Sequence, residues 1–123
     1  MKTTAMKLTV YERLTIPGIL PAKGNYEAGI KIRDIREKCE LTQDELKRIN
    51  FRTVQLPNGN VNAQWDEKKV RVKEVLFTEL ELLLIQNHLK ELDKKEELPV
   101  GDRQFMRLYE RFTIERKEQS KSR

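Results

Sequence analysis

Apolar positions over residues 26–49 recur at a helical spacing. The apolar face is marked by three side chains three and four positions apart: Ile32, Ile35 and Cys39. This spacing predicts an amphipathic helix of about three turns. Thr42 and Glu45 then have the spacing of a capping box, in which each side chain satisfies a backbone N–H group of the first turn. A second, shorter helix is therefore expected to end near residue 49.

The spacing changes from helical to alternating after residue 49. Apolar and polar residues alternate on both sides of PNGN, residues 57–60, and Asn-Gly is a strong hairpin signal because both residues tolerate positive φ. We therefore expect two strands joined by a turn, the second ending at Trp65. Alternation resumes in KKVRVKEVLF, residues 68–77, which predicts a third strand after a turn at Asp66-Glu67. A small antiparallel sheet with one buried face would result.

The clearest helical pattern covers residues 78–98. Thr78 and Glu81 form a capping-box pair at its start. The apolar stripe follows at three- and four-residue intervals, and further leucines widen it: Leu82, Ile85, Leu89 and Leu92, then Leu80, Leu83 and Leu84. So wide an arc predicts a central helix that contacts both the sheet and other helices. A last helix is predicted from a second stripe: Phe105, Leu108, Tyr109 and Phe112.

The N-terminal segment combines apolar residues with two prolines. We expect a short helix that ends before Pro17, because proline disfavours the helical conformation of the residue before it. Together these elements predict an α+β fold, with a small antiparallel β-hairpin or three-stranded sheet packed against about four to five helices. A chain of 123 residues has room for one core of ordinary size. We therefore expect a single compact domain over residues 1–114 and a flexible basic tail over 115–123.

Composition favours a polar globular protein. Apolar residues make up 37% of the chain and charged residues another 37%, with a mean hydropathy of −0.74. No apolar run approaches the roughly 18 residues that a membrane span needs, and the first residues lack the pattern of a secretion signal. The expectation is therefore a cytoplasmic protein that does not bind membranes.

The net charge of +5 is spread unevenly but not densely. Residues 1–50 and 101–123 each carry a net +3, whereas residues 51–100 carry −1. Charges of opposite sign alternate closely, as in KELDKKEE, residues 90–97, which is typical of a solvated surface with weak ion pairs. A dedicated duplex-binding protein usually has a denser basic stripe. The charge pattern therefore makes nucleic acid the less favoured partner.

The residues that could do chemistry argue against an enzyme. The chain has one cysteine and one histidine, so an internal disulfide is impossible and a zinc site would need other ligands. Both serines, Ser120 and Ser122, lie in the polar tail, and Cys39 lies on an apolar face. His88 has no visible partner to orient it as a general base.

Two further chemical motifs are also weak or missing. Asp66 and Glu67 are adjacent on an expected turn, where neighbouring side chains usually point apart and stay solvated, so they make a poor acid pair. The glycines are scattered, and neither a P-loop nor a dinucleotide-binding loop is present. We therefore predict a non-enzymatic protein without a cofactor, a metal or catalytic residues.

The stretch IRDIREKCELTQDELKRI, residues 32–49, resembles the first two helices of lambda-repressor-like helix-turn-helix domains. The resemblance implies a third, DNA-reading helix directly afterwards, but a hairpin pattern follows instead. A winged-helix variant would fit three helices followed by a hairpin, and its candidate contacts to phosphate or the minor groove are Arg52, Asn58 and Asn60. In that arrangement Asp44 and Glu45 would face DNA and be repelled. Nucleic-acid binding is thus the alternative function.

A second resemblance covers roughly residues 7–112. The segments ERLTIPGILPAKGN, IRDIREKCELTQDE, a hairpin with Trp65, EVLFTELELLLIQNHLKELDKKEEL and LYERF follow one another. This order is similar to that of a family of short proteins encoded by bacteriophages and prophages. No established activity comes with that family. The resemblance implies a phage-type interaction protein, either an accessory assembly component or a modulator of a host or defence protein.

Candidate partner-binding residues lie on three surfaces. They belong to the loop of residues 21–25, the hairpin and the basic C-terminal helix: Lys23, Asn25, Arg52, Asn58, Asn60, Arg103, Arg107, Arg111 and Arg116. The C-terminal arginines recur every four residues and would form one ridge, which could meet phosphate or an acidic partner, or could be the solvated back of the helix. A protein partner is expected, and the chain could also associate with itself.

Overall fold

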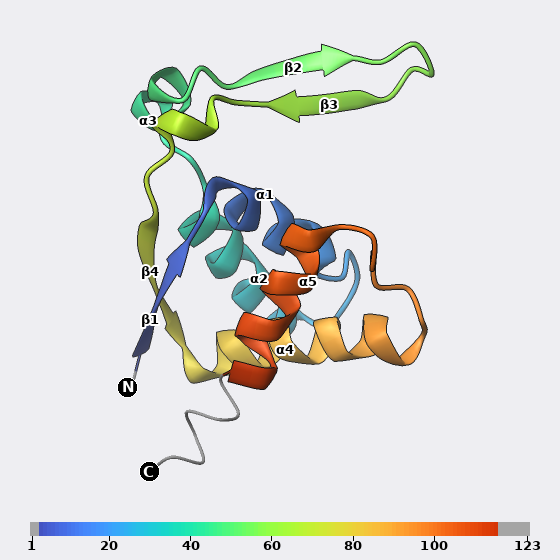
Figure 1. The fold of residues 1–123 in the computed structure, drawn as a ribbon. Helices are drawn as coiled ribbons and strands as arrows, with labels where there is room; N and C mark the ends of the chain where they lie inside the picture. The colour runs from blue at the N-terminus through green and yellow to red at the C-terminus, as the bar shows by residue number, and fades with distance from the viewer. Residues whose placement is uncertain (1–2, 116–123) are drawn as a thin grey trace.

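The computed structural model describes residues 3–115. These form an α+β fold of five α-helices and two separate two-stranded antiparallel sheets (Figure 1). The elements in chain order are β1 (Thr3–Leu8), α1 (Val10–Ile19), α2 (Tyr26–Cys39), α3 (Gln43–Arg48), β2 (Arg52–Gln55), β3 (Val61–Gln64), the short 3-10 helix Glu67–Lys69, β4 (Lys73–Thr78), α4 (Glu79–Lys94) and α5 (Arg103–Phe112). The predicted fold class and the order of helices and hairpin are confirmed.

The leucine-rich helix α4 is central, as predicted. It contacts β4, α1, α2 and α5, and its inner stripe of Leu82, Ile85 and Leu89 is fully buried. Phe77 of β4 and Phe112 of α5 meet there edge to face, with ring centroids 6.3 Å apart. The expected width of the apolar arc is wrong at its margins, because Leu80 is 59% exposed and Leu83 is 43% exposed. A narrower apolar stripe is enough to cover the contacts of α4, because the helix has neighbours on only part of its circumference.

Of the two sheet arrangements that the sequence predicts, the β-hairpin is present and the three-stranded sheet is wrong. Strand β4 begins at Lys73, after the 3-10 helix Glu67–Lys69, and pairs with the N-terminal strand β1 instead of the hairpin. The register runs antiparallel from Thr3 opposite Thr78 to Leu8 opposite Lys73. Val75 and Phe77 point into the core from β4. Pairing with β1 buries these two side chains over the helices. If β4 paired with the hairpin instead, it would lie away from the helices and these side chains would not be buried.

Helix α1 continues through Pro17 to Ile19, so the expected stop before this proline is also wrong. Proline has no N–H group, so the helix lacks one hydrogen bond at Pro17, but only Gly18 and Ile19 of α1 follow it. Ile16 and Leu20, on either side of it, are buried. Burial of these side chains favours the helical path and outweighs the local preference.

Three helices begin with the same device, a Thr-x-x-Glu capping box. The pairs are Thr9 with Glu12, Thr42 with Glu45, and Thr78 with Glu81. In each case the glutamate also accepts a hydrogen bond from a cation on a distant element: Arg111 for Glu12 at 2.6 Å, Arg13 for Glu45 at 2.5 Å, and Lys38 for Glu81 at 2.5 Å. Each helix start is thereby connected to another part of the fold.

The end of α4 offers a simple stability test. Glu96 has φ +58°, and the N–H groups of Glu96 and Glu97 close the helix onto Asp93 and Leu92. Glycine is preferred at this left-handed position. Glu96→Gly should therefore raise the free energy of unfolding by roughly 0.5–1 kcal/mol, seen as a higher midpoint in thermal unfolding.

Asn50, with φ +54° after α3, is the matched control for this change. Asparagine already tolerates the left-handed region, so Asn50→Gly should change the midpoint less. A lower midpoint for Glu96→Gly would contradict the assignment of strain to this residue.

Candidate partner-binding surfaces

The β2–β3 hairpin extends away from the rest of the protein (Figure 1). Its strands pair only with each other among the described residues, in a register from Arg52 opposite Gln64 to Gln55 opposite Val61. No residue of β2 or β3 is buried. Isolated two-stranded hairpins are marginally stable in water, so a bare hairpin of four-residue strands is unusual unless something covers it.

The tip of the hairpin is built by its own turn residues. The N–H group of Gly59 donates to the carbonyl of Leu56 at 2.9 Å, and Gly59 takes φ +89°, a value that glycine adopts without strain. Only this residue of the Asn-Gly pair is left-handed. The Asn58 side chain accepts from the N–H group of Asn60 at 3.0 Å. Asn58 therefore stabilises the turn, while the Asn60 side chain is exposed.

Beyond Arg52 at its base, the hairpin carries no charged residue. Residues 53–65 are thirteen consecutive positions without Asp, Glu, Lys, Arg or His, in a chain of which 37% is charged. Three apolar side chains are exposed on it: Val54 by 37%, Leu56 by 37% and Val61 by 68%. Natural edge strands usually carry charges that prevent pairing with other chains. This hairpin lacks them and presents two open edges, an arrangement that favours contact with another protein.

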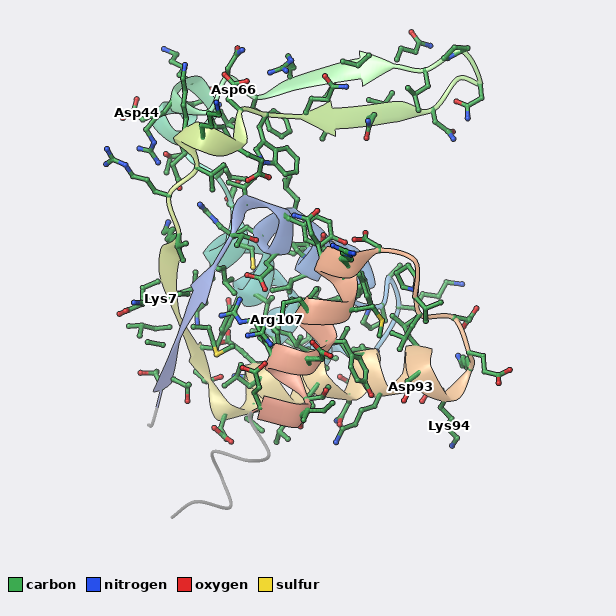
Figure 2. All side chains as sticks on the ribbon, viewed as in Figure 1. Lys7, Asp44, Asp66, Asp93, Lys94 and Arg107 are labelled. Carbon is green, nitrogen blue, oxygen red and sulfur yellow. The ribbon has the colours of Figure 1, made fainter. Side chains whose placement is uncertain are left out.

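The base of the hairpin is fixed by side-chain contacts. Phe51 and Trp65 stack with an interplanar angle of 8°, and the N–H group of Asp66 donates to the carbonyl of Ile49 at 2.8 Å. Arg52 donates to the Asn50 carbonyl at 2.9 Å and lies 3.4 Å from the Asp66 carboxylate. Figure 2 shows Asp44 and Asp66 at this base, beside α3. Arg52 is thus engaged within the protein and is a weaker candidate for phosphate contact than expected.

A buried arginine holds α3, and so the base of the hairpin, against α1. Arg13 is 2% exposed and donates to the carbonyls of Cys39 at 3.2 Å and Glu40 at 2.6 Å. Its guanidinium also binds both oxygens of Glu45 of α3, at 2.5 and 3.0 Å. The hydrogen bonds from Arg13 lower the pKa of Glu45 to about 2. Sequence reasoning missed Arg13, because nothing in its neighbours along the chain marks it as buried.

The expected arginine ridge on α5 is broken up by ion pairs. Arg111 binds the buried carboxylate of Glu12 and the carbonyl of Lys7, each at 2.6 Å. Arg107 pairs with Glu115, and Arg103 has no ion pair within residues 3–115. Figure 2 shows Arg107 on the face of α5. Arg116 lies outside the described residues. Two of the three described arginines are therefore neutralised inside the molecule, which lowers their value for binding phosphate.

The loop between α1 and α2 gives one structural residue and one free one. Asn25 caps α2, since its side chain accepts the N–H group of Ala28 at 2.8 Å. Lys23 is exposed, and no ion pair to it is present in the described part of the chain. Lys23 therefore offers its whole charged group to a ligand, whereas the side-chain oxygen of Asn25 is already used in the cap.

Cys39 is buried, and burial raises the pKa of its thiol to about 11. A thiol with so high a pKa is a poor nucleophile, so its role in packing agrees with the prediction from its apolar face. Within residues 3–115 no group of three or more histidine, cysteine or acidic side chains is arranged to hold a metal ion. None of the described helices is long and apolar enough to cross a membrane.

The hairpin is the strongest candidate among these surfaces. The hairpin has open edges and exposed apolar side chains, whereas most of the α5 arginines are already paired. Comparison with known proteins adds no relative to this picture: no protein-family model, curated protein or solved structure matches the chain.

Proposed function

We propose that this chain is a non-enzymatic interaction protein that binds another protein through the β2–β3 hairpin. The observation that carries this proposal is the uncharged run of residues 53–65, which stands clear of the core with both strand edges open. An extended segment of a partner can add to such an edge, where main-chain hydrogen bonds supply affinity and side-chain contacts supply specificity. Val54, Leu56 and Val61 would supply the apolar contacts.

The same surface argues against nucleic acid as the hairpin's partner. Affinity for DNA or RNA comes largely from cations that neutralise phosphates, and residues 53–65 contain none. Arg52, at the base, is engaged with Asn50 and Asp66. A winged-helix protein would need free basic groups on this wing to neutralise phosphates. Nucleic-acid binding therefore remains the less supported alternative.

The biological setting that we propose is a bacteriophage or prophage protein acting in the host cytoplasm. The support for it is the ordered set of motifs between residues 7 and 112, together with the exposed contact surface of the hairpin. In such a setting the protein would serve as a small assembly component or as a modulator of a host or defence protein.

Placing a charge on the hairpin tests the proposal. Val61→Lys introduces a cation at a side chain that is 68% exposed, so the fold should be unaffected. If a partner covers this side chain, the buried lysine should weaken binding by roughly tenfold or more, since an unpaired buried charge costs at least about 1.4 kcal/mol. The measurement is quantitative capture of binding proteins from lysates of source cells, with and without phage infection.

Val100→Lys is the matched control. Val100 is 72% exposed and lies between α4 and α5, far along the chain from the hairpin. The Val100→Lys variant should capture the same proteins as the unchanged chain, whereas the Val61→Lys variant should lose them. Equal capture by both variants would reject the hairpin as the contact surface. Retardation of duplex or single-stranded DNA at low salt, lost at higher salt, would favour the nucleic-acid alternative instead.

A further inference from the structure

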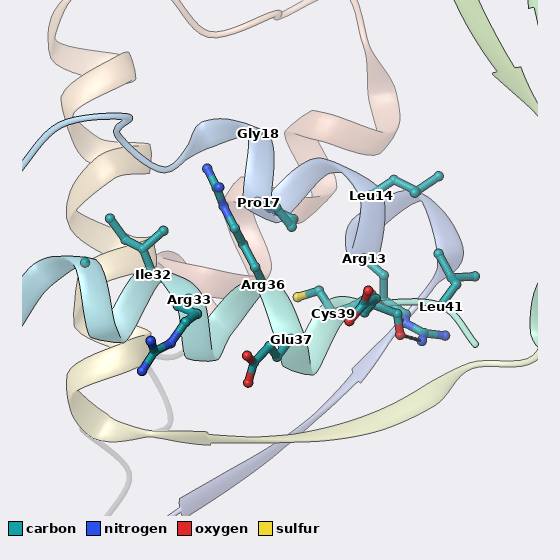
Figure 3. A pocket seen from close by; sticks show the side chains of 12 residues that line it. Arg13, Leu14, Pro17, Gly18, Ile32, Arg33, Arg36, Glu37, Cys39 and Leu41 are labelled. Atoms are coloured by element: carbon teal, nitrogen blue, oxygen red, sulfur yellow. Dashed lines mark hydrogen bonds between the residues drawn. The ribbon is translucent and has the colours of Figure 1, made fainter. Parts of the chain in front are cut away.

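A groove runs between α1 and α2, apart from the hairpin. Its volume is about 900 Å³, within the range of ordinary ligand sites. The helix α1 contributes Leu14, Pro17 and Gly18 to its wall, and α2 contributes Gly29 and Ile32 (Figure 3). A Cβ atom added at Gly18 or Gly29 would meet no atom of another element within 4 Å. The two glycines thus leave open space where most helix pairs are filled by side chains.

The groove continues into a smaller hollow beside the loop that precedes α2. That hollow has a volume of about 290 Å³ and shares Gly29, Ile32 and Arg36 with the groove. Lys23 and Asn25 line its far end. The two hollows are therefore adjacent along α2, and we refer to them together as the trough.

The charges along this trough are separated. Arg36 reaches from α2 toward Pro17 and Gly18 in Figure 3, and Lys23 lies at the loop end. Neither has an ion pair within residues 3–115, in contrast to Arg13, which Glu45 neutralises. The N-terminus of α2 adds its partial positive charge at the same end. Glu37 and Glu40 line the opposite end.

We infer that the trough binds a short peptide segment of a partner protein that combines acidic and apolar side chains. The acidic residue would bind Lys23 and Arg36 at the loop end, and the apolar residues would cover Gly29, Ile32 and Pro17. The chain's own C-terminal residues 116–123 are a poor occupant, since they hold four cations and one acid. A nucleic acid is a poor occupant as well, because Glu37 and Glu40 would repel its phosphates.

Selection from a random library of 12-residue peptides tests the inference. The unchanged protein should enrich peptides with Asp or Glu next to apolar residues. Gly29→Leu should abolish this enrichment, because Gly29 lines both hollows and a leucine would occupy the space between them. The helix would also gain a better helix-forming residue than glycine. Arg36→Gln should weaken the best peptide by roughly tenfold or more, the factor expected for one lost hydrogen bond to a charged group.

Arg71→Gln is the matched control, since Arg71 is an exposed arginine outside the trough. It should bind the selected peptide like the unchanged protein, and so should Val61→Lys, which separates this site from the hairpin. On binding, backbone NMR signals of Gly18, Gly29 and Arg36 should shift. Equal enrichment with Gly29→Leu, enriched peptides without acidic residues, or equal shifts with inorganic phosphate alone would each overturn the inference.

Discussion

Replacing Arg13 with glutamine is expected to lower the free energy of unfolding by about 3–5 kcal/mol, the cost of removing one partner of a buried ion pair. The guanidinium of Arg13 is buried and serves three groups at once: the carbonyls of Cys39 and Glu40 and the carboxylate of Glu45. A glutamine side chain is shorter and uncharged, so the Glu45 carboxylate would keep its desolvation without its cation. Chemical denaturation with urea measures the change directly.

Arg48→Gln is the control for this experiment, because Arg48 is exposed on α3 and should change the stability by less than about 0.5 kcal/mol. Replacing both partners, Arg13→Met with Glu45→Leu, should recover part of the loss, since no charge is then left without its partner. Equal stabilities for Arg13→Gln and Arg48→Gln would show that the buried cluster does not hold α3 in place.

Acid should reduce the difference between the unchanged protein and Arg13→Gln. The pKa of Glu45 is lowered from 4.5 to about 2 in the folded protein, mainly by its hydrogen bonds from Arg13. A lowered pKa stabilises the fold above the unfolded value, and this stabilisation is lost as the pH falls from about 5 toward 2. Because Glu45 is partly exposed to solvent, the expected contribution is roughly 1–3 kcal/mol.

The capping boxes show what local patterns can and cannot predict. Thr42 with Glu45 and Thr78 with Glu81 were predictable, because a capping box depends on residues three positions apart. The cations that bind these glutamates, Arg13 and Lys38, come from elements 32 and 43 residues away. Sequence spacing carries no signal for such pairs, so a buried arginine could not be told from the many exposed ones.

The pairing of β1 with β4 could not be predicted either, because the two strands lie far apart in the sequence. Strand β1, TTAMKL, directs only alternate residues inward and is half polar, so it has a weak strand pattern by itself. Its partner β4 lies about 70 residues later. The alternation in residues 68–77 predicted a strand there, but the nearest strand in sequence, β3, is not its neighbour in space.

Most of the predicted binding residues are used inside the molecule. Asn25 and Asn58 close local hydrogen bonds, and Arg52 and Arg111 pair with Asp66 and Glu12. The residue type alone does not show whether a polar side chain is free in solvent or hydrogen-bonded within the fold, so the sequence could not distinguish the two cases. A stronger signal is that residues 53–65 contain no charge at all, which can be read directly from the sequence.

Shortening the hairpin should remove partner binding and leave the core folded. Replacing residues 54–62 with the two-residue turn Asn-Gly keeps the Phe51–Trp65 stack and the Arg52–Asp66 pair, and removes every exposed apolar side chain of the hairpin. None of the removed residues belongs to the buried core cluster or to the partly buried side chains packed against it, so the core should be preserved. Loss of binding should be complete, in contrast to the partial effect of a single lysine.

The most direct test of the account measures the fold and the binding of this shortened chain together. We expect its backbone NMR spectrum to retain the signals of β1, β4, α4 and α5, with captured partners reduced to the level of an unrelated control protein. Undiminished capture by a folded, shortened chain would contradict the role of the hairpin, and collapse of the core signals would contradict its independence from the rest of the fold.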